Sequence, residues 1–342
     1  AVDISDPCVY PLGFMLVSSQ VKKVWPDTTV LNFNLFDYDL KKEFEGKDIV
    51  LLTGGQEFLP EIVRVSEIAR EMDIKTTLGG SLATFKAKEM RNHVDVVYQG
   101  EFGKHTPIDN LPWPDYEGFG IEEYHKRHSI RYMGVLASRG CPFSCTFCAN
   151  VCKYRERSLE GVSREIDHYQ KKYRIEMLVF NDNTLNVSKS RFMGICAMMK
   201  GRGLNWGAAI RADVFDREMA RSFKDSGGKY FVVGIESFRQ ARLDKMNKKL
   251  KVEDLFHTLN YLHKFHIDYH GNVILGINGE TMEDIANEVD NIPEGYNVFP
   301  VLAQAFPGTK IHSSLAPEER ERLNGVFSAY ATNNGKTVYP LT

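Results

Sequence analysis

The sequence predicts an α/β fold in two successive parts: an N-terminal doubly wound, Rossmann-like parallel sheet domain and then a partial (β/α)6 barrel. Two observations lead to this fold class. In the first ~105 residues, short apolar stretches alternate with stretches of helical periodicity, as in a parallel sheet with crossover helices. In the next ~175 residues six strand–helix units follow, which are too few for the closed eight-stranded barrel and fit an open, partial one.

The composition is that of an ordinary globular protein, with 342 residues, 43% of them hydrophobic and 26% charged. A net charge of −2 gives no field that favours a nucleic-acid partner, and the short run Lys248, Lys249, Lys251 is interpreted as a solvated helix end. No apolar run reaches the ~18 residues of a membrane span. The first residues lack the basic region of a secretory signal, so we expect a cytoplasmic protein.

The first part carries five predicted strands: Val2–Ser5, Thr29–Leu35, Asp48–Thr53, Lys75–Leu78 and Val94–Tyr98. One helix is expected from about Leu12 to Val24, and another has apolar residues at helical spacing, namely Ile62, Val65, Ile68 and Met72. A proline-rich stretch around Asn110–Asp115 predicts a linker. We therefore place a first domain at residues 1–110, a linker at 111–129, the barrel at 130–310 and a short tail at 311–342.

Three of the predicted strands end in turn residues: Thr53-Gly54-Gly55, Gly79-Gly80-Ser81 and Gly100-Glu101. Ligands of parallel sheets bind beyond the carboxyl ends of the strands, and glycine allows a backbone to approach a ligand closely. These turns therefore indicate a binding crevice, although tight turns alone would also explain the glycines.

The second part contains six predicted strands: Tyr132–Ser138, Met177–Asn181, Trp206–Arg211, Tyr230–Ile235, Tyr269–Gly276 and Asn297–Gln304. The clearest helix between them has Leu255, Leu259, Leu262 and His266 on one face. In a barrel of this kind the functional loops lie at the carboxyl ends of the strands, where every motif considered next is found.

Three cysteines, Cys141, Cys145 and Cys148, follow the first of these strands with the spacing C-x-x-x-C-x-x-C. Soft thiolates select an iron–sulfur cluster or zinc, and three ligands would leave one iron of a four-iron cluster open. A structural zinc site with Cys152 as fourth ligand and a disulfide are the alternatives, and both fit the spacing or the expected compartment less well. Cys8 and Cys196 are interpreted as small core residues.

The segment Ser138–Cys148, with Phe147 before the last cysteine, resembles the signature of the radical S-adenosylmethionine (radical SAM) superfamily. The resemblance implies that the open iron of a [4Fe–4S] cluster chelates S-adenosylmethionine. An electron from a donor such as flavodoxin or ferredoxin then cleaves it to a 5′-deoxyadenosyl radical that abstracts hydrogen. The protein would supply position and exclusion of water.

Later strand ends also resemble this family, at Asn181-Asp182-Asn183, Arg211, Gly234-Ile235-Glu236-Ser237, Val273–Ile277 and Phe306-Pro307-Gly308-Thr309. The resemblance implies that Asp182 and Asn183 bind the amino group of S-adenosylmethionine and that Arg211 binds its carboxylate. The other implied contacts are Phe147, Glu236, Ser237, Gly276 and Ile277. Asn278 replaces the usual proline of the fifth element. A helix cap at Asp182 and structural ion pairs at Arg211 and Glu236 are the alternatives.

The first part resembles the cobalamin-binding domain that precedes many radical SAM domains, through Tyr10-Pro11-Leu12-Gly13, Leu78-Gly79-Gly80, Tyr98–Glu101 and Leu111-Pro112-Trp113-Pro114. It implies cobalamin contacts at Thr53, Gly54, Gly55, Gly79, Gly80, Gly100 and Glu101. The D-x-H-x-x-G motif, whose histidine binds cobalt in other cobalamin proteins, is absent. Because members of this branch commonly lack that histidine, cobalamin stays in the prediction.

The resemblance therefore predicts a cobalamin-dependent methyltransferase that acts on an unactivated carbon or phosphorus of a small molecule. A radical SAM enzyme without cobalamin, performing cyclisation, decarboxylation, epimerisation or rearrangement, is the first alternative. A zinc-bound module without enzyme activity is a remote second one. Tyr10, Tyr269 and His270 could act as a base or radical quencher, but none is assigned a catalytic role.

Overall fold

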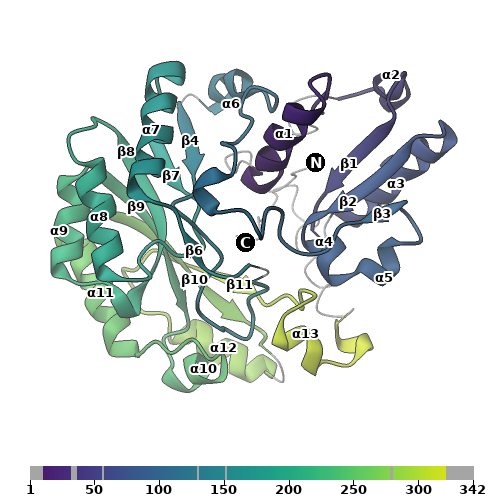
Figure 1. The fold of residues 1–342 in the computed structure, drawn as a ribbon. Coiled ribbons are helices and arrows are strands. Elements are labelled where there is room, and N and C mark those ends of the chain that lie inside the picture. The colour runs from purple at the N-terminus through teal and green to yellow at the C-terminus, as the bar shows by residue number, and fades with distance from the viewer. Residues whose placement is uncertain are drawn as a thin grey trace. The chain divides into compact units, whose positions relative to one another are not determined.

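A computed structural model describes residues 11–31, 37–55, 58–128, 131–150, 152–277 and 280–320. The chain divides into two compact units, Ala1–Ile130 and Arg131–Thr342 (Figure 1). The predicted strand Val2–Ser5 and most of Thr29–Leu35 lie outside the described residues. Among those described, no helix is long and apolar enough to cross a membrane.

The first unit contains a parallel sheet in the order β1-β2-β3, with β1 at Ile49–Thr53, β2 at Lys75–Gly79 and β3 at Val96–Val97. These strands confirm the predicted parallel sheet. The helices of this part are α1 Leu12–Val24, α2 Leu40–Phe44, α3 Leu59–Glu71, α4 Gly80–Phe85 and α5 Ala87–Met90. Ile62 of α3 packs with Leu78 of β2, which is how the predicted apolar stripe of α3 meets the sheet.

The predicted linker packs against α1 in the structure. It follows a 3-10 turn at Ile108–Asn110 and contains helix α6 at Ile121–His128. The Asp115 carboxylate accepts a hydrogen bond from Ser18 Oγ at 2.6 Å and pairs with Lys22 Nζ at 2.7 Å. The buried rings of Tyr116 and Phe119 add apolar contact. These contacts hold residues 111–128 within the first unit.

The second unit is built on a six-stranded parallel sheet in the order β11-β10-β9-β8-β7-β4. The strands are β4 Tyr132–Val135, β7 Met177–Phe180, β8 Asn205–Arg211, β9 Gly228–Glu236, β10 Asp268–Leu275 and β11 Val298–Leu302. This order confirms the open partial barrel. The predicted strand Tyr132–Ser138 is split, because Ser138–Arg139 forms β5 and pairs antiparallel with β6 at Arg155–Glu156.

Helices cover the outer side of this sheet (Figure 1). They are α7 Leu159–Tyr173, α8 Lys189–Met199, α9 Arg217–Asp225 and α11 Val252–Lys264. The unit also contains α10 Gln240–Lys245, α12 Met282–Asp290, α13 Lys310–Ser314 and a 3-10 turn at Ala212–Val214. Helix α11 ends before His266, whose φ of 50° is left-handed. His266 therefore does not extend the apolar face of Leu255, Leu259 and Leu262, contrary to the prediction.

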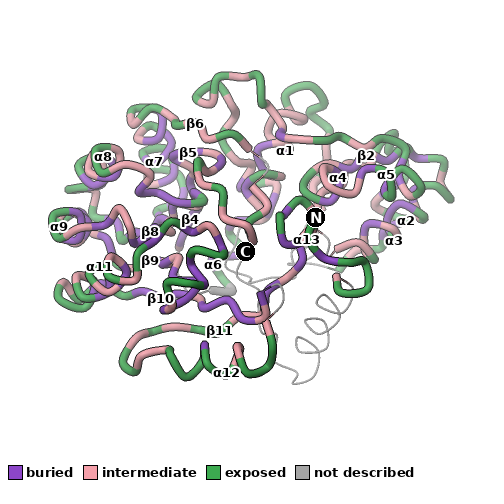
Figure 2. Tube along the Cα trace, turned by 90° about the horizontal axis from the view of Figure 1, so that it is seen from below, coloured by how far each residue is buried: buried purple, intermediate pink, exposed green. Residues whose placement is uncertain are grey.

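The two faces of the sheet differ in burial. On the outer face Trp206, Phe223 and Phe231 form an aromatic core, with the Phe223 and Phe231 ring centroids 3.9 Å apart. Along β9 and β10, buried residues alternate with half-buried ones such as Val232 and His270 (Figure 2). The half-buried residues define what we call the inner face. Because side chains alternate along a strand, the outer face carries the core and the inner face stays accessible.

The close pairing of β8 with β9 depends on Gly207. A Cβ atom built on Gly207 would lie 2.8 Å from the carbonyl oxygen of Tyr230 on the neighbouring strand. We expect Gly207→Ala to lower the free energy of unfolding by about 1–3 kcal/mol, because the two strands must separate. Ala209→Ser, at a half-buried position on the same strand, should change it by less than about 0.5 kcal/mol in the same urea titration. Equal effects of the two variants would contradict this account.

Candidate active site

The cysteine loop begins beyond the carboxyl end of β4. Its entry requires Gly140, which has a φ of 76° and whose Cβ would lie 2.5 Å from the Cys152 carbonyl oxygen. The loop then runs through Cys141, Cys145 and Cys148, as the sequence predicts for a functional loop at this end of the barrel.

The three thiols lie close enough to influence one another. Burial raises the pKa of Cys141, and the nearby Cys145 raises it further. Cys148 retains an exposed surface, yet burial raises the pKa of its thiol to about 11, with smaller contributions from Cys145 and Cys141. Thiols of this kind ionise when a metal replaces their protons. Among the described residues, no group of three His, Cys, Asp or Glu side chains is placed to bind a single metal ion. A four-iron cluster has a different requirement, because each thiolate binds a different iron atom.

A turn between α10 and α11, residues Met246–Lys248, supports the cysteine loop. The Thr146 amide donates to the Met246 carbonyl at 2.9 Å. The Asn247 amide group donates to the Ser144 carbonyl and hydroxyl oxygens, both at 2.9 Å. Asn247 has a left-handed φ of 51°, a conformation that asparagine tolerates better than most residues. These bonds fix the backbone on both sides of Cys145, the second of the three cysteines.

Asp182, at the end of β7, supports the start of the same loop. Its carboxylate accepts hydrogen bonds from the Ala137 amide at 2.9 Å and the Ser138 hydroxyl at 2.5 Å. Burial raises the pKa of Asp182 to about 6, although these two donors oppose the shift. Asn183, in contrast, is exposed. Whether either residue binds S-adenosylmethionine stays a prediction.

Arg211, at the end of β8, is 4% exposed and is held on all sides. Its guanidinium forms a two-pronged ion pair with Asp213, at 2.9 and 2.8 Å, and donates to the Lys248 carbonyl at 2.6 Å. Asn186 holds its backbone, with hydrogen bonds of 2.8 Å to both the Arg211 amide and carbonyl. The guanidinium carbon lies 3.8 Å from the ring centroid of Phe143 in the cysteine loop. The predicted role in carboxylate binding is not tested by these contacts.

Glu236 ends β9 with a φ of 65°, which is unusual for a residue with a side chain. Its carboxylate pairs with Lys248 Nζ at 2.7 Å. A Cβ on Gly234 would lie 2.6 Å from this Nζ atom, so glycine at that position makes room for the ion pair. Ser237 is fully buried and donates to Glu288 Oε1 at 2.6 Å. Of the two predicted contacts, Glu236 lies near Cys148 of the cysteine loop. Ser237 instead bonds to Glu288 of helix α12.

The end of β10 is organised by a buried arginine. Arg242 donates to both carboxylate oxygens of Glu280, at 2.7 and 2.9 Å, and to the Ile274 carbonyl at 2.6 Å. Glu280 in turn accepts from the Ile277 amide at 3.0 Å. Gly276 adopts a φ of 74° at the bend. The ion pair therefore fixes the backbone of Gly276 and Ile277, while Asn278 lies outside the described residues.

In the first unit the three predicted glycine turns come together. The Gly54 carbonyl accepts from the Leu82 amide at 3.1 Å, and Thr84 Oγ1 links the Gly80 carbonyl to the Gly100 amide. A Cβ on Gly80 would lie 2.6 Å from Thr53 Oγ1. Gly55 and Gly79 continue from the ends of β1 and β2, and Glu101, which follows Gly100, is buried. Cobalamin contacts at these residues stay a prediction.

Four residues of the second unit that the sequence did not predict as site residues contribute to the site: Asn186, Asp213, Asn247 and Lys248. Lys248 was expected in a solvated helix end, but it is only 6% exposed, because Glu236 pairs with it inside the barrel end. Asn247 lies about a hundred positions from the loop that it supports. No local pattern could have revealed such a contact.

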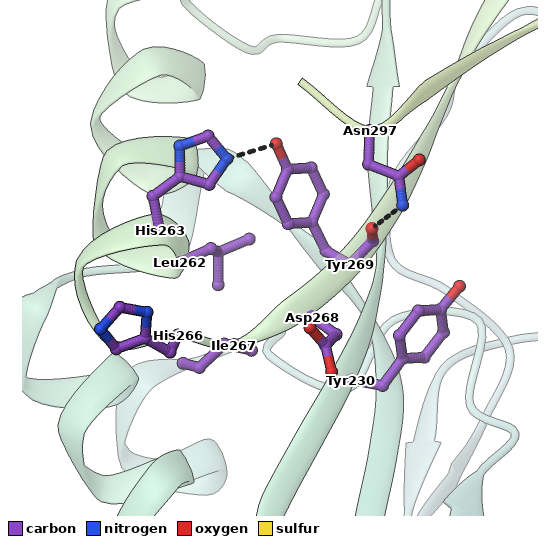
Figure 3. Close-up of a pocket in the computed structure, with 8 residues that line it drawn as sticks. All are labelled: Tyr230, Leu262, His263, His266, Ile267, Asp268, Tyr269 and Asn297. Atoms are coloured by element: carbon purple, nitrogen blue, oxygen red, sulfur yellow. Dashed lines mark hydrogen bonds between the residues drawn. The ribbon is translucent and has the colours of Figure 1, made fainter. Parts of the chain in front are cut away.

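A separate pocket of about 570 Å³ lies at the amino ends of β9 and β10, opposite the cysteine loop (Figure 3). His263 Nε2 lies 3.1 Å from the Tyr269 hydroxyl, and Asn297 donates to the Tyr269 carbonyl at 2.7 Å. These polar groups bond to one another.

Comparison with known proteins agrees with the geometry of the second unit. Residues 135–292 match the radical SAM superfamily. An uncharacterized methyltransferase of Pyrococcus horikoshii is 24% identical over 343 residues, covering 91% of this chain and 74% of the relative. The bacteriochlorophyllide d C-12(1)-methyltransferase of Chlorobaculum tepidum is 24% identical over 342 residues, with the same coverage of 91% and 74%.

A solved structure shares the fold across both units. It is TsrM from Kitasatospora setae, a radical S-adenosylmethionine methyltransferase with cobalamin and a [4Fe–4S] cluster bound. The TM-score is 0.68 at 15% identity, covering 89% of this chain and 72% of TsrM. The radical SAM match covers the cysteine loop and the ends of strands β7 to β10 that follow it, and the assignment of Cys141, Cys145 and Cys148 as cluster ligands stays a prediction.

The cysteine assignment predicts a sharp difference between variants. Cys141→Ala, Cys145→Ala and Cys148→Ala should each lose most bound iron and sulfide after anaerobic reconstitution, because each removes one of three thiolate ligands. Cys152→Ala is the matched control and should retain both, together with absorbance near ~400 nm. Zinc in place of iron, or equal loss from Cys152→Ala, would contradict the assignment.

The raised pKa of Asp182 predicts how stability depends on pH. The folded state binds a proton on Asp182 up to pH about 6, whereas the unfolded chain releases it near pH 3.8, so stability falls as pH rises between these values. Relative to Asp182→Asn, the wild type should lose up to about 3 kcal/mol between pH 4 and pH 7. Urea unfolding followed by Trp206 fluorescence, with Trp25→Phe and Trp113→Phe in both proteins, measures this difference. A difference that does not change with pH would contradict the prediction.

Proposed function

We propose that this chain, an enzyme of the radical SAM superfamily, is a cobalamin-dependent methyltransferase that acts on an unactivated carbon or phosphorus of a small molecule. The observation that carries the proposal is the joint presence of two features: the supported three-cysteine loop at one end of the barrel, and the convergent glycine turns of the first unit. The methyltransferase names of relatives aligned over 91% of the chain support it.

The residues of the second unit have defined tasks in this reaction. Cys141, Cys145 and Cys148 hold the cluster, and Asp182 and Asn247 fix the loop that carries them. Glu236, Asn183, Phe147 and the backbone of Gly276 and Ile277 surround the place expected for S-adenosylmethionine. When bound, a [4Fe–4S] cluster reduced by a donor such as flavodoxin or ferredoxin would supply the electron for cleavage, and methylated cobalamin would supply the methyl group. The chain's contribution is to orient the reactants and exclude water.

The inner face of the barrel sheet is the proposed support for the substrate. In the part of the chain that the structure describes, His270 Nε2 and Asn272 Oδ1 are buried atoms with no hydrogen-bond partner. The ring of Phe299 lies beside His270, with its centroid 6.1 Å away, and Phe299 pairs with Asn272 across the neighbouring strands. A largely apolar surface with two polar groups that lack partners suits a small, mainly apolar substrate with a hydrogen-bonding group.

The corrinoid part of the proposal is tested by a pair of glycine variants. Gly100 and Gly46 both have a left-handed φ, of 90° and 69°, and both have open space where a Cβ would stand. Gly100 follows β3 at the predicted crevice, and Gly46 lies before the amino end of β1. Gly100→Val should therefore lose cobalamin that the wild type retains after anaerobic reconstitution and gel filtration, whereas Gly46→Val should keep it.

Three outcomes of that experiment are informative. Retention of cobalamin that acquires label from methyl-labelled S-adenosylmethionine supports the proposal. Formation of 5′-deoxyadenosine by a wild-type protein that retains no corrinoid would instead establish the cobalamin-independent alternative. Equal retention by the two glycine variants would remove the predicted crevice from the proposal.

The substrate surface is tested without the substrate. A buried acceptor without a partner costs about 1–3 kcal/mol, so Asn272→Leu should raise the free energy of unfolding by about 1 kcal/mol. Asn186→Leu is the control, because the Asn186 amide is fully bonded to Arg211, and it should lower that free energy by at least about 2 kcal/mol. Destabilisation by Asn272→Leu in urea titration would show that Asn272 has a structural task instead.

A further inference from the structure

Arg211 also makes one contact with a sulfur atom, in addition to its hydrogen bonds with oxygen atoms. Its Nη1 atom lies 3.9 Å from Cys145 Sγ, within hydrogen-bond range for sulfur. Its Nε and Nη2 atoms are committed to Asp213 and to the Lys248 carbonyl. A guanidinium has five N–H donors, and these contacts with oxygen use three of them, so both Nη1 donors remain and one of them can face Cys145 Sγ. The Nε–Nη2 edge of the Arg211 guanidinium, which would suit a ligand carboxylate, therefore binds Asp213. The Nη1 atom faces Cys145, a predicted cluster ligand.

We propose that Arg211 is a positioning residue that donates an N–H···S hydrogen bond to Cys145 and thereby raises the reduction potential of the cluster, and that it does not bind the carboxylate of S-adenosylmethionine. A donor to a ligand sulfur stabilises negative charge there. The reduced cluster carries one more electron than the oxidised one, so the bond stabilises the reduced form more and makes reduction easier.

The surroundings of Arg211 hold this donor rigidly. Asp213 fixes the plane of the guanidinium, Asn186 fixes the backbone, and the Phe143 ring lies against the guanidinium at 3.8 Å. The side chains of Arg211 and Asp213 are 5% and 18% exposed, so water competes little for the donor. A rigid, desolvated cation beside a thiolate acts on its charge more strongly than a mobile surface cation.

The experiment measures a potential and a binding constant separately. Arg211→Lys retains the charge but has no planar fork that could reach Asp213 and Cys145 together. Asp213→Asn leaves Arg211 in place and loosens its orientation. Both are reconstituted with iron and sulfide without corrinoid, titrated with dithionite under electron paramagnetic resonance, and then titrated with S-adenosylmethionine. Arg191→Lys is the control, because Arg191 donates to the Ala137 and Arg157 carbonyls near the loop and contacts no cysteine in the described structure.

The expected result is that Arg211→Lys and Asp213→Asn both lower the reduction potential. At one fixed applied potential the ratio of reduced to oxidised cluster should fall about tenfold, which is ~59 mV for a one-electron couple. Iron content and the affinity for S-adenosylmethionine should stay within about threefold of wild type, and Arg191→Lys should not change the potential.

Two results would overturn the proposal. One is an unchanged reduction potential in Asp213→Asn. This variant also tests the proposal if Arg211→Lys binds no iron. The other is an unchanged potential together with a loss of S-adenosylmethionine affinity of tenfold or more in Arg211→Lys, which would show that Arg211 binds the carboxylate. Neither measurement requires corrinoid, substrate or methyl transfer, so the result does not depend on the function proposed above.

Discussion

The guanidinium of Arg211 joins three segments that are distant in the chain: the end of β8, the turn after α10 and the cysteine loop. It does so through Asp213, the Lys248 carbonyl, Cys145 Sγ and the Phe143 ring. A buried guanidinium is tolerated only when its charge and donors are satisfied. The requirement to satisfy this one cation therefore fixes where the cysteine loop can lie relative to the sheet.

The same constraint recurs at neighbouring strand ends. Lys248 pairs with Glu236 beyond β9, and Arg242 pairs with Glu280 beyond β10. Replacing these pairs by apolar residues could give equal or greater stability, because desolvation offsets most of the attraction between buried charges. Their position at the carboxyl ends of strands fits a site in which charges are oriented before reactants arrive.

The division of labour within the second unit follows from strand geometry. The outer face of the sheet carries the aromatic core around Trp206 and Phe231, which supplies stability. The inner face is left half-buried, and at its carboxyl end the backbone adopts left-handed conformations at Glu236 and Gly276. The outer face of the strands therefore forms the hydrophobic core, and the inner face is available for the site. The inner face can carry polar groups that a hydrophobic core would exclude.

The sequence by itself determined the alternation of strands and helices, the open barrel, and the cysteines with their loop, because periodicity and ligand spacing are local properties. Two features did not follow from the local pattern: residues 111–128 pack against α1 through Asp115, and α11 ends before His266. The tertiary structure alone decided that Asn247 supports Ser144 and that Lys248 is buried against Glu236. These contacts join segments brought together only when parallel strands align their carboxyl ends, and no spacing along the chain encodes them.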